Sequence, residues 1–299
     1  MLPFIENKTL PHNQRLNNDN EISSVINDLI KTNEYLKLNN IHLNNKNKEI
    51  VDSIQYARLI HQAILPKQRH FDRAFKESFH IYQPKDIIGG DFYWVTNVDE
   101  LSYVILGDCT GHGVPGALLS ILGYSLLNYI VHGKNILSCK DIITELDQRV
   151  IDSFHMAQEE RFNNDWIDIS ICCYNNKTNM LEFSGAMQSL YLIRNENLFE
   201  YKGNKFPVAG WQIESKRNFK SHFIDIYKND TIYILSDGLS DQFGGPQNKK
   251  FNIRRLKELL LSVSKLSMDK QKEMILHIFN KWKGDQEQVD DISLIGIKF

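Results

Sequence analysis

The chain has 299 residues and a mass of 34.9 kDa, and its 35 basic and 37 acidic side chains give a formal charge of -2. This balance lacks the basic footprint that binds phosphate backbones, so we expect no nucleic-acid partner. Apolar residues make up 42% of the sequence, which is enough for a sizeable core. No uninterrupted run of roughly 18 apolar residues occurs, so we expect no membrane span.

The N-terminus and the cysteines favour a cytoplasmic location. Residues 1–6 (MLPFIE) have neither the basic start nor the apolar stretch of a signal peptide. The four cysteines are Cys109, Cys139, Cys172 and Cys173. They form no C-x-x-C pair and no disulfide-like framework, so we expect them to stay reduced.

The first 65 residues differ from the rest of the chain. Residues 1–20 are polar, rich in asparagine and without periodicity, which predicts a disordered lead-in. Residues 21–65 are predicted to form a linker helix because apolar residues recur every seven positions from Ile22. One heptad position holds Ile22, Leu29, Leu36, Leu43, Ile50, Ala57 and Ile64, and the position four residues later holds Ile26, Asn33, Asn40, Asn47, Ile54 and His61.

Two interpretations of this repeat stay open. The helix packs on the surface of its own domain, or residues 22–65 form a parallel coiled coil that joins two copies of the chain. We favour the homodimer because the repeat continues for longer than one domain needs. Asparagine at three successive positions of the seam would leave such a dimer marginally stable.

Residues 66–299 read as one α+β domain. Short β-rich runs occur at 79–82, 91–95, 103–106, 167–174, 180–183, 190–193, 222–226, 231–235 and 292–297. Helical periodicity occurs at 115–131, 140–156, 253–263 and 268–281. Because the strands come in clusters and the helices in pairs, the order favours antiparallel sheets with helices outside over a doubly wound parallel sheet.

Four aspartates stand at strand ends, each beside glycine or another acid: Asp91, Asp108, Asp237 and Asp290. One such residue is typical of a turn or a helix cap. Four of them suggest a site for hard divalent cations, since carboxylate oxygens suit Mg²⁺ or Mn²⁺ better than zinc. After Asp108, Gly111 and Gly113 would let the backbone pass close to an ion or a phosphate.

Four segments carry a resemblance to a known family. They are residues 89–94 (GGDFYW), 107–117 (GDCTGHGVPGA), 236–244 (SDGLSDQFG) and 288–293 (QVDDIS), and residues 53–66 resemble the helix that precedes the family's domain. Together they resemble the SpoIIE-type branch of the metal-dependent Ser/Thr protein phosphatases, the PPM family. The resemblance covers about residues 50–299, with the motifs in the family's order.

The resemblance implies a β-sandwich of two mainly antiparallel sheets flanked by helices, with two Mn²⁺ or Mg²⁺ ions at one end. It implies a protein-serine/threonine phosphatase, a phosphoric monoester hydrolase of bacterial-type signalling. The reaction would be direct attack on phosphorus by a hydroxide that bridges the ions. The expected substrate is a phosphorylated regulatory protein, such as a switch protein like an anti-sigma-factor antagonist.

Carried over by position, the resemblance assigns metal ligands. Asp108 would bridge the ions and Cys109 would offer its backbone carbonyl, so that its thiol is no nucleophile. Asp237 and Asp290 would complete one ion's shell, and Asp91 would serve the other, directly or through water, with Asp108 and Asp237 as the catalytic pair.

Other assignments are weaker. Asp291 would support the ligands from behind, and Lys85 stands near where some relatives hold phosphate. His112 is either a structural histidine or a proton donor to the leaving oxygen.

One segment departs from the family. Residues 165–168 read DWID where relatives commonly have DGMD, so Trp166 replaces a glycine that would permit positive φ. If Asp165 helps to hold a third ion, Trp166 would alter that ion's affinity or mark a partner contact.

Rival functions explain less of the sequence. A diguanylate cyclase needs glutamate after Gly89-Gly90-Asp91, but Phe92 stands there. A structural coiled-coil scaffold accounts only for residues 22–65. The main alternative is a catalytically silent member of the phosphatase fold that binds partners, and the presence of all four acids argues against it.

Overall fold

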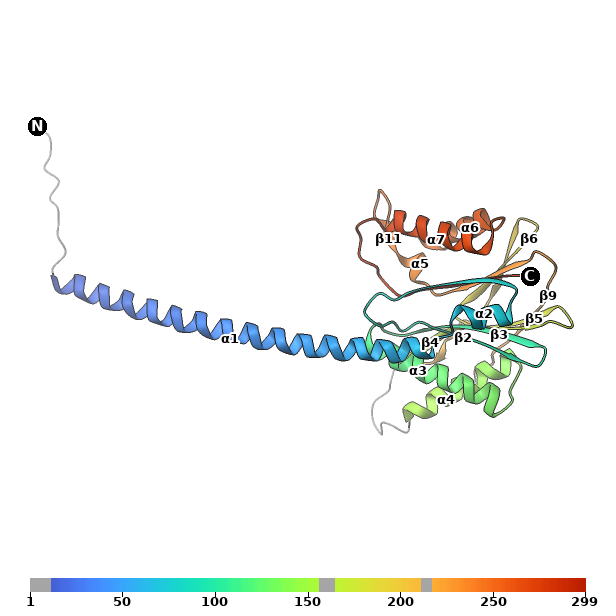
Figure 1. Cartoon of the computed structure of the whole chain (residues 1–299), viewed down its shortest axis with the longest axis horizontal. Helices are drawn as coiled ribbons and strands as arrows, with labels where there is room; N and C mark the ends of the chain where they lie inside the picture. Colours follow the sequence, from blue (N-terminus) through green and yellow to red (C-terminus); the bar gives the residue numbers. More distant parts are fainter. Residues whose placement is uncertain (1–11, 156–164, 211–216) are drawn as a thin grey trace, which may run out of the picture. The chain divides into compact units, whose positions relative to one another are not determined.

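The computed structural model describes residues 12–155, 165–210 and 217–299. The chain divides into two compact units, Met1–Ser53 and Ile54–Phe299. Helix α1 (His12–Ile64) runs through the first unit and ends in the second (Figure 1). The predicted linker helix therefore begins at His12, within the segment predicted to be disordered, while residues 1–11 lie outside the described residues.

The solvent exposure of the heptad seam of α1 changes near the boundary between the units. Between residues 23 and 53 the large apolar side chains of α1 are exposed, Leu36 at 54% among them. From Ile54 on, the same seam is partly buried, and His61 is 1% exposed. The heptad seam of α1 is thus continuous in the sequence, but only its C-terminal part, which belongs to the second unit, is partly buried.

The second unit contains two antiparallel sheets. The five-stranded sheet has the order β1 (Glu77–Gln83), β13 (Ile292–Lys298), β10 (Thr231–Leu235), β6 (Ser189–Arg194) and β7 (Asn197–Lys202). The six-stranded sheet has the order β2 (Phe92–Val98), β3 (Leu101–Cys109), β4 (Trp166–Asn175), β5 (Met180–Ala186) and β9 (His222–Asp225), and β8 (Val208–Ala209) pairs with β4.

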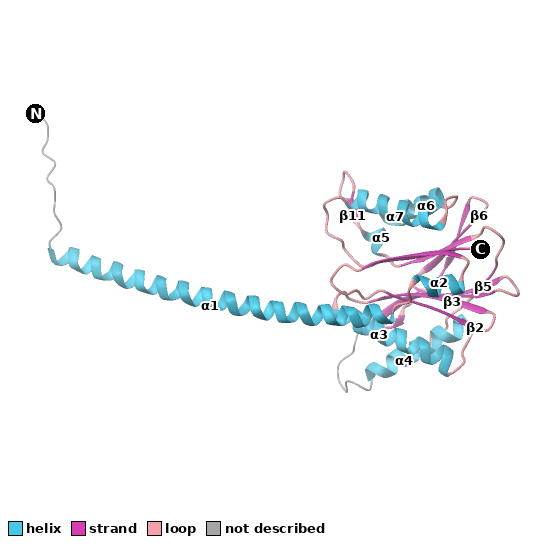
Figure 2. Ribbon diagram, in the orientation of Figure 1, coloured by secondary structure: helices cyan, strands magenta, loops and turns pink. Residues whose placement is uncertain are grey.

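Helices cover the outer faces of the sheets (Figure 2). On the six-stranded sheet lie α3 (Val114–Asn128), the π-helical turn η1 (Tyr129–Gly133) and α4 (Cys139–His155). On the five-stranded sheet lie α6 (Asn252–Val263) and α7 (Met268–Lys283). The remaining elements are α2 (Gln68–Ala74), α5 (Gly238–Asp241) and the hairpin of β11 (Phe243–Gly244) with β12 (Lys249–Lys250).

Strand alternation builds two hydrophobic layers. In β10, Ile232 and Ile234 join the core between the sheets, whereas Tyr233 and Leu235 pack under α6 and α7. The stretch Val114–Gly133 is long and apolar enough to cross a membrane by composition alone. Its residues Leu119, Leu127 and Ile130 are buried in the domain core, as expected for a core helix.

The structure confirms the predicted α+β class and antiparallel sandwich. Each predicted strand and helix of residues 66–299 is present to within a few residues, although Met156 lies outside the described residues. The sequence analysis did not predict β7, β8, β11, β12, α2 or α5. Most of these are short or half-exposed, so they leave little hydrophobic periodicity.

Candidate active site

Three aspartates of the six-stranded sheet stand in one row. Asp108 of β3 is the register partner of Asp168 in β4, and Asp91 directly precedes β2, whose Phe92 pairs with Gly107. Ile167 faces α3, where its Cδ1 would lie 3.4 Å from a Cβ on Gly123. Because side chains alternate along a strand, the three carboxylates point to the other face, toward the five-stranded sheet.

The five-stranded sheet brings three more acids to the same end. Asp237 follows β10 closely, and Asp290 and Asp291 directly precede β13. Between β10 and Asp237, Ser236 links the sheets because its Oγ donates to Asp91 Oδ2 at 2.7 Å. The four aspartates predicted as ligands therefore come together from different strand ends.

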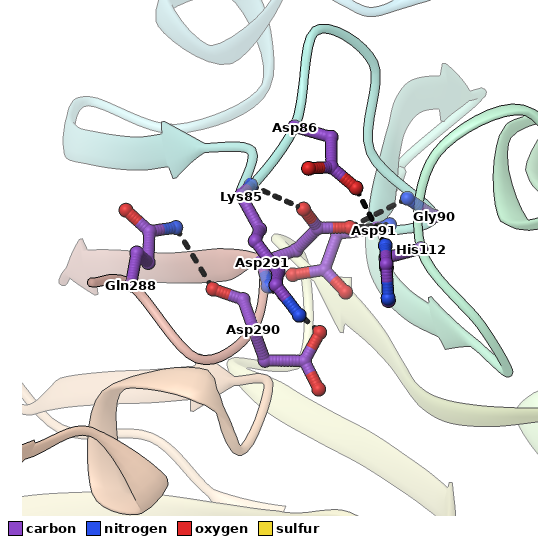
Figure 3. A network of polar contacts seen from close by, with 8 residues as sticks. All are labelled: Lys85, Asp86, Gly90, Asp91, His112, Gln288, Asp290 and Asp291. Carbon is purple, nitrogen blue, oxygen red and sulfur yellow. Dashed lines mark hydrogen bonds and ion pairs between the residues drawn. The ribbon is translucent and has the colours of Figure 1, made fainter. Parts of the chain in front are cut away.

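Asp291 organises the loop that carries Asp91 (Figure 3). Its carboxylate accepts hydrogen bonds from the backbone N–H groups of Lys85 at 2.7 Å and Gly90 at 2.6 Å, and from Asp91 at 3.3 Å. A Cβ on Gly89 would lie 2.7 Å from Asp291 Oδ2, so the loop needs glycine there. Asp291 thus holds backbone, which agrees with the supporting position expected of it.

The clustered carboxylates raise one another's pKa values. Burial, and then Asp91, Asp237, Asp168 and Asp290, raise the pKa of Asp108 well above its usual value. Burial and then the Asp291 charge raise the pKa of Asp91 to about 7, against the hydrogen bond from Ser236. Burial and then Asp237 raise the pKa of Asp168 to about 7. The carboxylates at this end of the sandwich therefore repel one another, and this repulsion favours their protonated forms.

Cys109 is a buried side chain at the end of β3. Burial, followed by the Asp108 charge, raises the pKa of its thiol well above the usual value. The thiol is therefore protonated near neutral pH, and a thiolate nucleophile is disfavoured. The backbone carbonyl of Cys109 lies close to Gly90, where a Cβ would be 3.1 Å from the oxygen.

His112 lies at the exposed side of the site, where its Nδ1 and Asp86 Oδ2 are 2.5 Å apart. This ion-pair partner holds the ring between the Asp86 loop and the segment that leads into α3 (Figure 3). Both readings of His112 stay open, because a paired and exposed imidazole serves as a structural group or as a proton donor. Lys85 enters the network through its backbone N–H rather than through its amine.

Trp166 lies in a small network that connects two loops. Thr110 and Trp166 exchange hydrogen bonds, Thr110 Oγ1 donates to Asp165 Oδ1 at 3.3 Å, and the Gly210 N–H donates to the Asp165 carbonyl at 3.1 Å. A Cβ on Gly210 would lie 3.1 Å from Trp166 Cβ. The Trp166 side chain therefore begins beside Gly210, the residue that directly follows β8, and a glycine at position 166 would leave this space open.

The donor set fits a hard divalent cation in its chemistry. Within the described ranges, no three His, Cys, Asp or Glu side chains meet closely enough to make a preformed metal group. However, Asp168 Oδ1 is buried with no hydrogen-bond partner among the described residues, and the neighbouring carboxylates raise one another's pKa. Asp91, Asp108, Asp237, Asp290 and the Cys109 carbonyl could hold such ions, since all offer oxygen.

Asp168 is the member of this cluster that the sequence analysis missed as a site residue. The strand there alternates between isoleucine and a polar or small residue, and Asp168 looked like part of a loop motif. Its pairing with Asp108 depends on the register of β3 against β4, which is known only from the tertiary structure. The signal available in the sequence was an acid placed on the inward face of an otherwise apolar strand.

Comparisons with known proteins agree with this fold. Residues 99–299 match the family model described as stage II sporulation protein E (SpoIIE). A comparison with curated proteins found no match.

Many solved structures are similar to the chain, among them the following three. The SiaA-PP2C domain of Pseudomonas aeruginosa is 27% identical with a TM-score of 0.76, over 85% of this chain and 98% of that one. The PP2C phosphatase domain of SpoIIE from Bacillus subtilis, in a structure with a fragment of its regulatory domain, is 13% identical with a TM-score of 0.60, over 75% and 63%. RsbX in complex with magnesium is 16% identical with a TM-score of 0.52, over 74% and 94%.

Proposed function

Because the chain belongs to the SpoIIE family, we propose that it is a metal-dependent phosphatase of phosphoserine and phosphothreonine in proteins. The observation that carries the proposal is the meeting of Asp91, Asp108, Asp237 and Asp290 at one end of the sandwich. Four acids placed together cost free energy unless a cation or proton compensates them, so a purely structural role does not account for them.

In the proposed site, Asp91, Asp108, Asp237, Asp290 and the Cys109 carbonyl would hold Mn²⁺ or Mg²⁺. Two such ions, when bound, would polarise the phosphoryl oxygens and lower the pKa of water. The chain's own contribution is placement: Ser236 orients Asp91, and Asp291 fixes the loop backbone around Gly90. Water would attack phosphorus directly, forming a new P–O bond while the P–O bond to the serine or threonine oxygen breaks, and that oxygen would take up a proton and leave as the free hydroxyl. The buried, protonated thiol of Cys109 is no nucleophile.

The proposed substrate is a phosphorylated regulatory protein, such as a switch protein of the anti-sigma-factor-antagonist type, in the cytoplasm. The proposed assembly is a homodimer through a parallel coiled coil of residues 22–65. Support for the dimer comes from the seam of α1, whose side chains Leu29, Leu36 and Leu43 are all exposed. An apolar stripe of this length in water is favourable only when something covers it.

The test is phosphate release by the purified full chain from phosphorylated casein, with Mn²⁺, with Mg²⁺ and with EDTA. We expect release that needs the metal and that EDTA abolishes. If no phosphate is released with either ion while the folded chain binds Mn²⁺ in calorimetry, the chain is the silent partner-binding member of the fold. Release that persists in EDTA would contradict the metal assignment.

A further inference from the structure

The turn between β5 and β6 crosses from one sheet to the other at the acidic end. β5 ends with Ala186 paired to Ile169, so the turn continues alongside Asp168. β6 begins at Ser189, and its pairing of Tyr191 with Tyr233 continues toward Asp237. The two residues of this turn, Met187 and Gln188, therefore stand between acids of both sheets.

Met187 has an unusual conformation. Its φ is +61°, in the left-handed region that residues other than glycine, asparagine and aspartate seldom adopt. Its side chain is nevertheless 55% exposed, so no packing inside the domain explains why a methionine occupies the turn. Residues with such strained backbone conformations cluster at active sites and ligand-binding segments.

The backbone around Met187 is tightly held. The Met187 N–H donates to the Asn204 carbonyl at 2.8 Å, and Asn204 Nδ2 donates to the Gly185 carbonyl at 2.7 Å. The Gly203 N–H donates to the Gln188 carbonyl at 3.1 Å, and a Cβ on Gly203 would lie only 2.3 Å from that oxygen. The turn therefore presents Met187 from a fixed platform.

Gln188 ties this platform to the acidic row. Its side chain is only 8% exposed, and its Nε2 donates to the Asp168 carbonyl at 3.1 Å. Its Oε1 is buried and has no hydrogen-bond partner among the described residues. The buried amide thus fixes the distance between the Met187 backbone and the strand that carries Asp168.

We propose that Met187 is a specificity-determining residue that contacts an apolar side chain next to the phosphorylated residue of a protein substrate. The inference rests on the proposed phosphatase function and names a chemical preference for it. A phosphate held among the acids and cations leaves its flanking polypeptide at the rim, where Met187 is the exposed apolar group of the turn. Methionine suits this role because its flexible, polarisable side chain adapts to different apolar partners.

The experiment compares two phosphoserine peptides, one with leucine and one with alanine on each side of the phosphoserine, and p-nitrophenyl phosphate as a probe without a polypeptide. The variants of the full chain are Met187→Ala, Met187→Leu and, as a matched control, Met180→Ala. Met180 is the first residue of β5, at the end of that strand opposite the Met187 turn, and it is 37% exposed. Thermal melting confirms that each variant folds, and fluorescence anisotropy gives the Kd of each labelled peptide.

We expect Met187→Ala to raise KM for the leucine peptide about tenfold with little change in kcat, which corresponds to losing part of one buried side chain. The preference for leucine over alanine should disappear, Met187→Leu should restore it, and Met180→Ala should keep it. Equal leucine-peptide Kd values for wild type and Met187→Ala would overturn the role of Met187. Failure of the wild type to hydrolyse any probe would instead overturn the proposed function, so the two failures have different readouts.

Discussion

The long helix and the domain each contain an unfavourable feature, which is exposed apolar surface in the helix and clustered negative charge in the domain. In residues 23–53 the helix exposes its apolar side chains to water, Leu29 and Leu36 among them. The domain buries its apolar residues in two continuous cores but gathers acids at one end. One region therefore leaves apolar surface uncovered, and the other leaves negative charge uncompensated.

The difference indicates what each region binds. Uncovered apolar surface is removed from water by another apolar surface, and a second helix with the same seam is such a partner. Clustered carboxylates are neutralised by protons or by cations. These two requirements are independent. A substitution in the acidic cluster should therefore leave association through the helix unchanged, and a substitution in the helix should leave the acidic cluster unchanged. The predictions below test this separation of the two regions.

The largest effect should come from Asp108→Asn. The amide keeps the volume of the side chain but removes the charge at the centre of the acidic row. We expect phosphatase activity with Mn²⁺ to fall by about 10³-fold, the scale of losing one preorganised electrostatic contact. The melting temperature of the metal-free chain should rise, because carboxylate repulsion is relieved.

The matched control for this variant is Asp285→Asn, which changes an exposed aspartate outside the cluster. Its activity should equal that of the wild type. Full activity in Asp108→Asn would contradict the assignment of the acidic end as the active site. A changed sedimentation coefficient in Asp108→Asn would contradict the separation of the two regions.

The next effect concerns the seam of the helix. Replacing Asn33, Asn40 and Asn47 together with leucine makes the seam continuously apolar, so we expect the dimer to tighten by about 100-fold or more. Analytical ultracentrifugation of both chains at micromolar concentration measures this, and monomers in both would end the coiled-coil hypothesis.

A smaller effect, on the pH dependence of stability, is expected at His61, which lies where the seam becomes buried. His61 Nε2 lies 2.8 Å from Ser120 Oγ, and burial lowers the pKa of His61 from 6.5 to about 4. Above pH 6.5 both folded and unfolded chains hold neutral histidine; as pH falls toward 4, the unfolded chain binds the proton first and stability is lost. Between pH 7 and 5 this loss should be about 2 kcal/mol.

Urea unfolding at the two pH values tests His61 against a matched histidine. His61→Gln should remove the acid loss attributed to this residue, while His42→Gln, at an exposed position of the same helix, should retain it. An unchanged pH dependence in His61→Gln would show that the histidine titrates freely in the folded chain.

The smallest effect is expected at Cys109. Cys109→Ser preserves the backbone carbonyl and nearly the side-chain volume, so activity should stay within about threefold of the wild type, under 1 kcal/mol in the barrier. Assays with p-nitrophenyl phosphate, with circular dichroism to monitor the fold, measure this. Inactivation of a folded variant would favour thiolate chemistry over the acidic site.

Much of the domain was predictable because its strands alternate and its helices repeat. The strand 231–235 and the helix 253–263 were found from apolar periodicity, and Asp91, Asp108, Asp237 and Asp290 were found from glycines and acids at strand ends. The roles of these four residues as metal ligands stay predictions. The short strand β8 was not predicted, because two residues carry no period and its existence depends on pairing with Trp166 and Ile167.

The sequence by itself determined the α+β class, the strand-end acids and the heptad seam, because each is a local pattern of residue types along one element. Only the tertiary structure decided that Asp168 stands beside Asp108, that Asp291 holds the backbone around Gly90, and that the seam is partly buried from Ile54 on. These facts depend on register and on contacts between residues up to 206 positions apart, such as Lys85 and Asp291. Local periodicity says which face of an element is apolar, but the partner of that face is set by the packing of the whole chain.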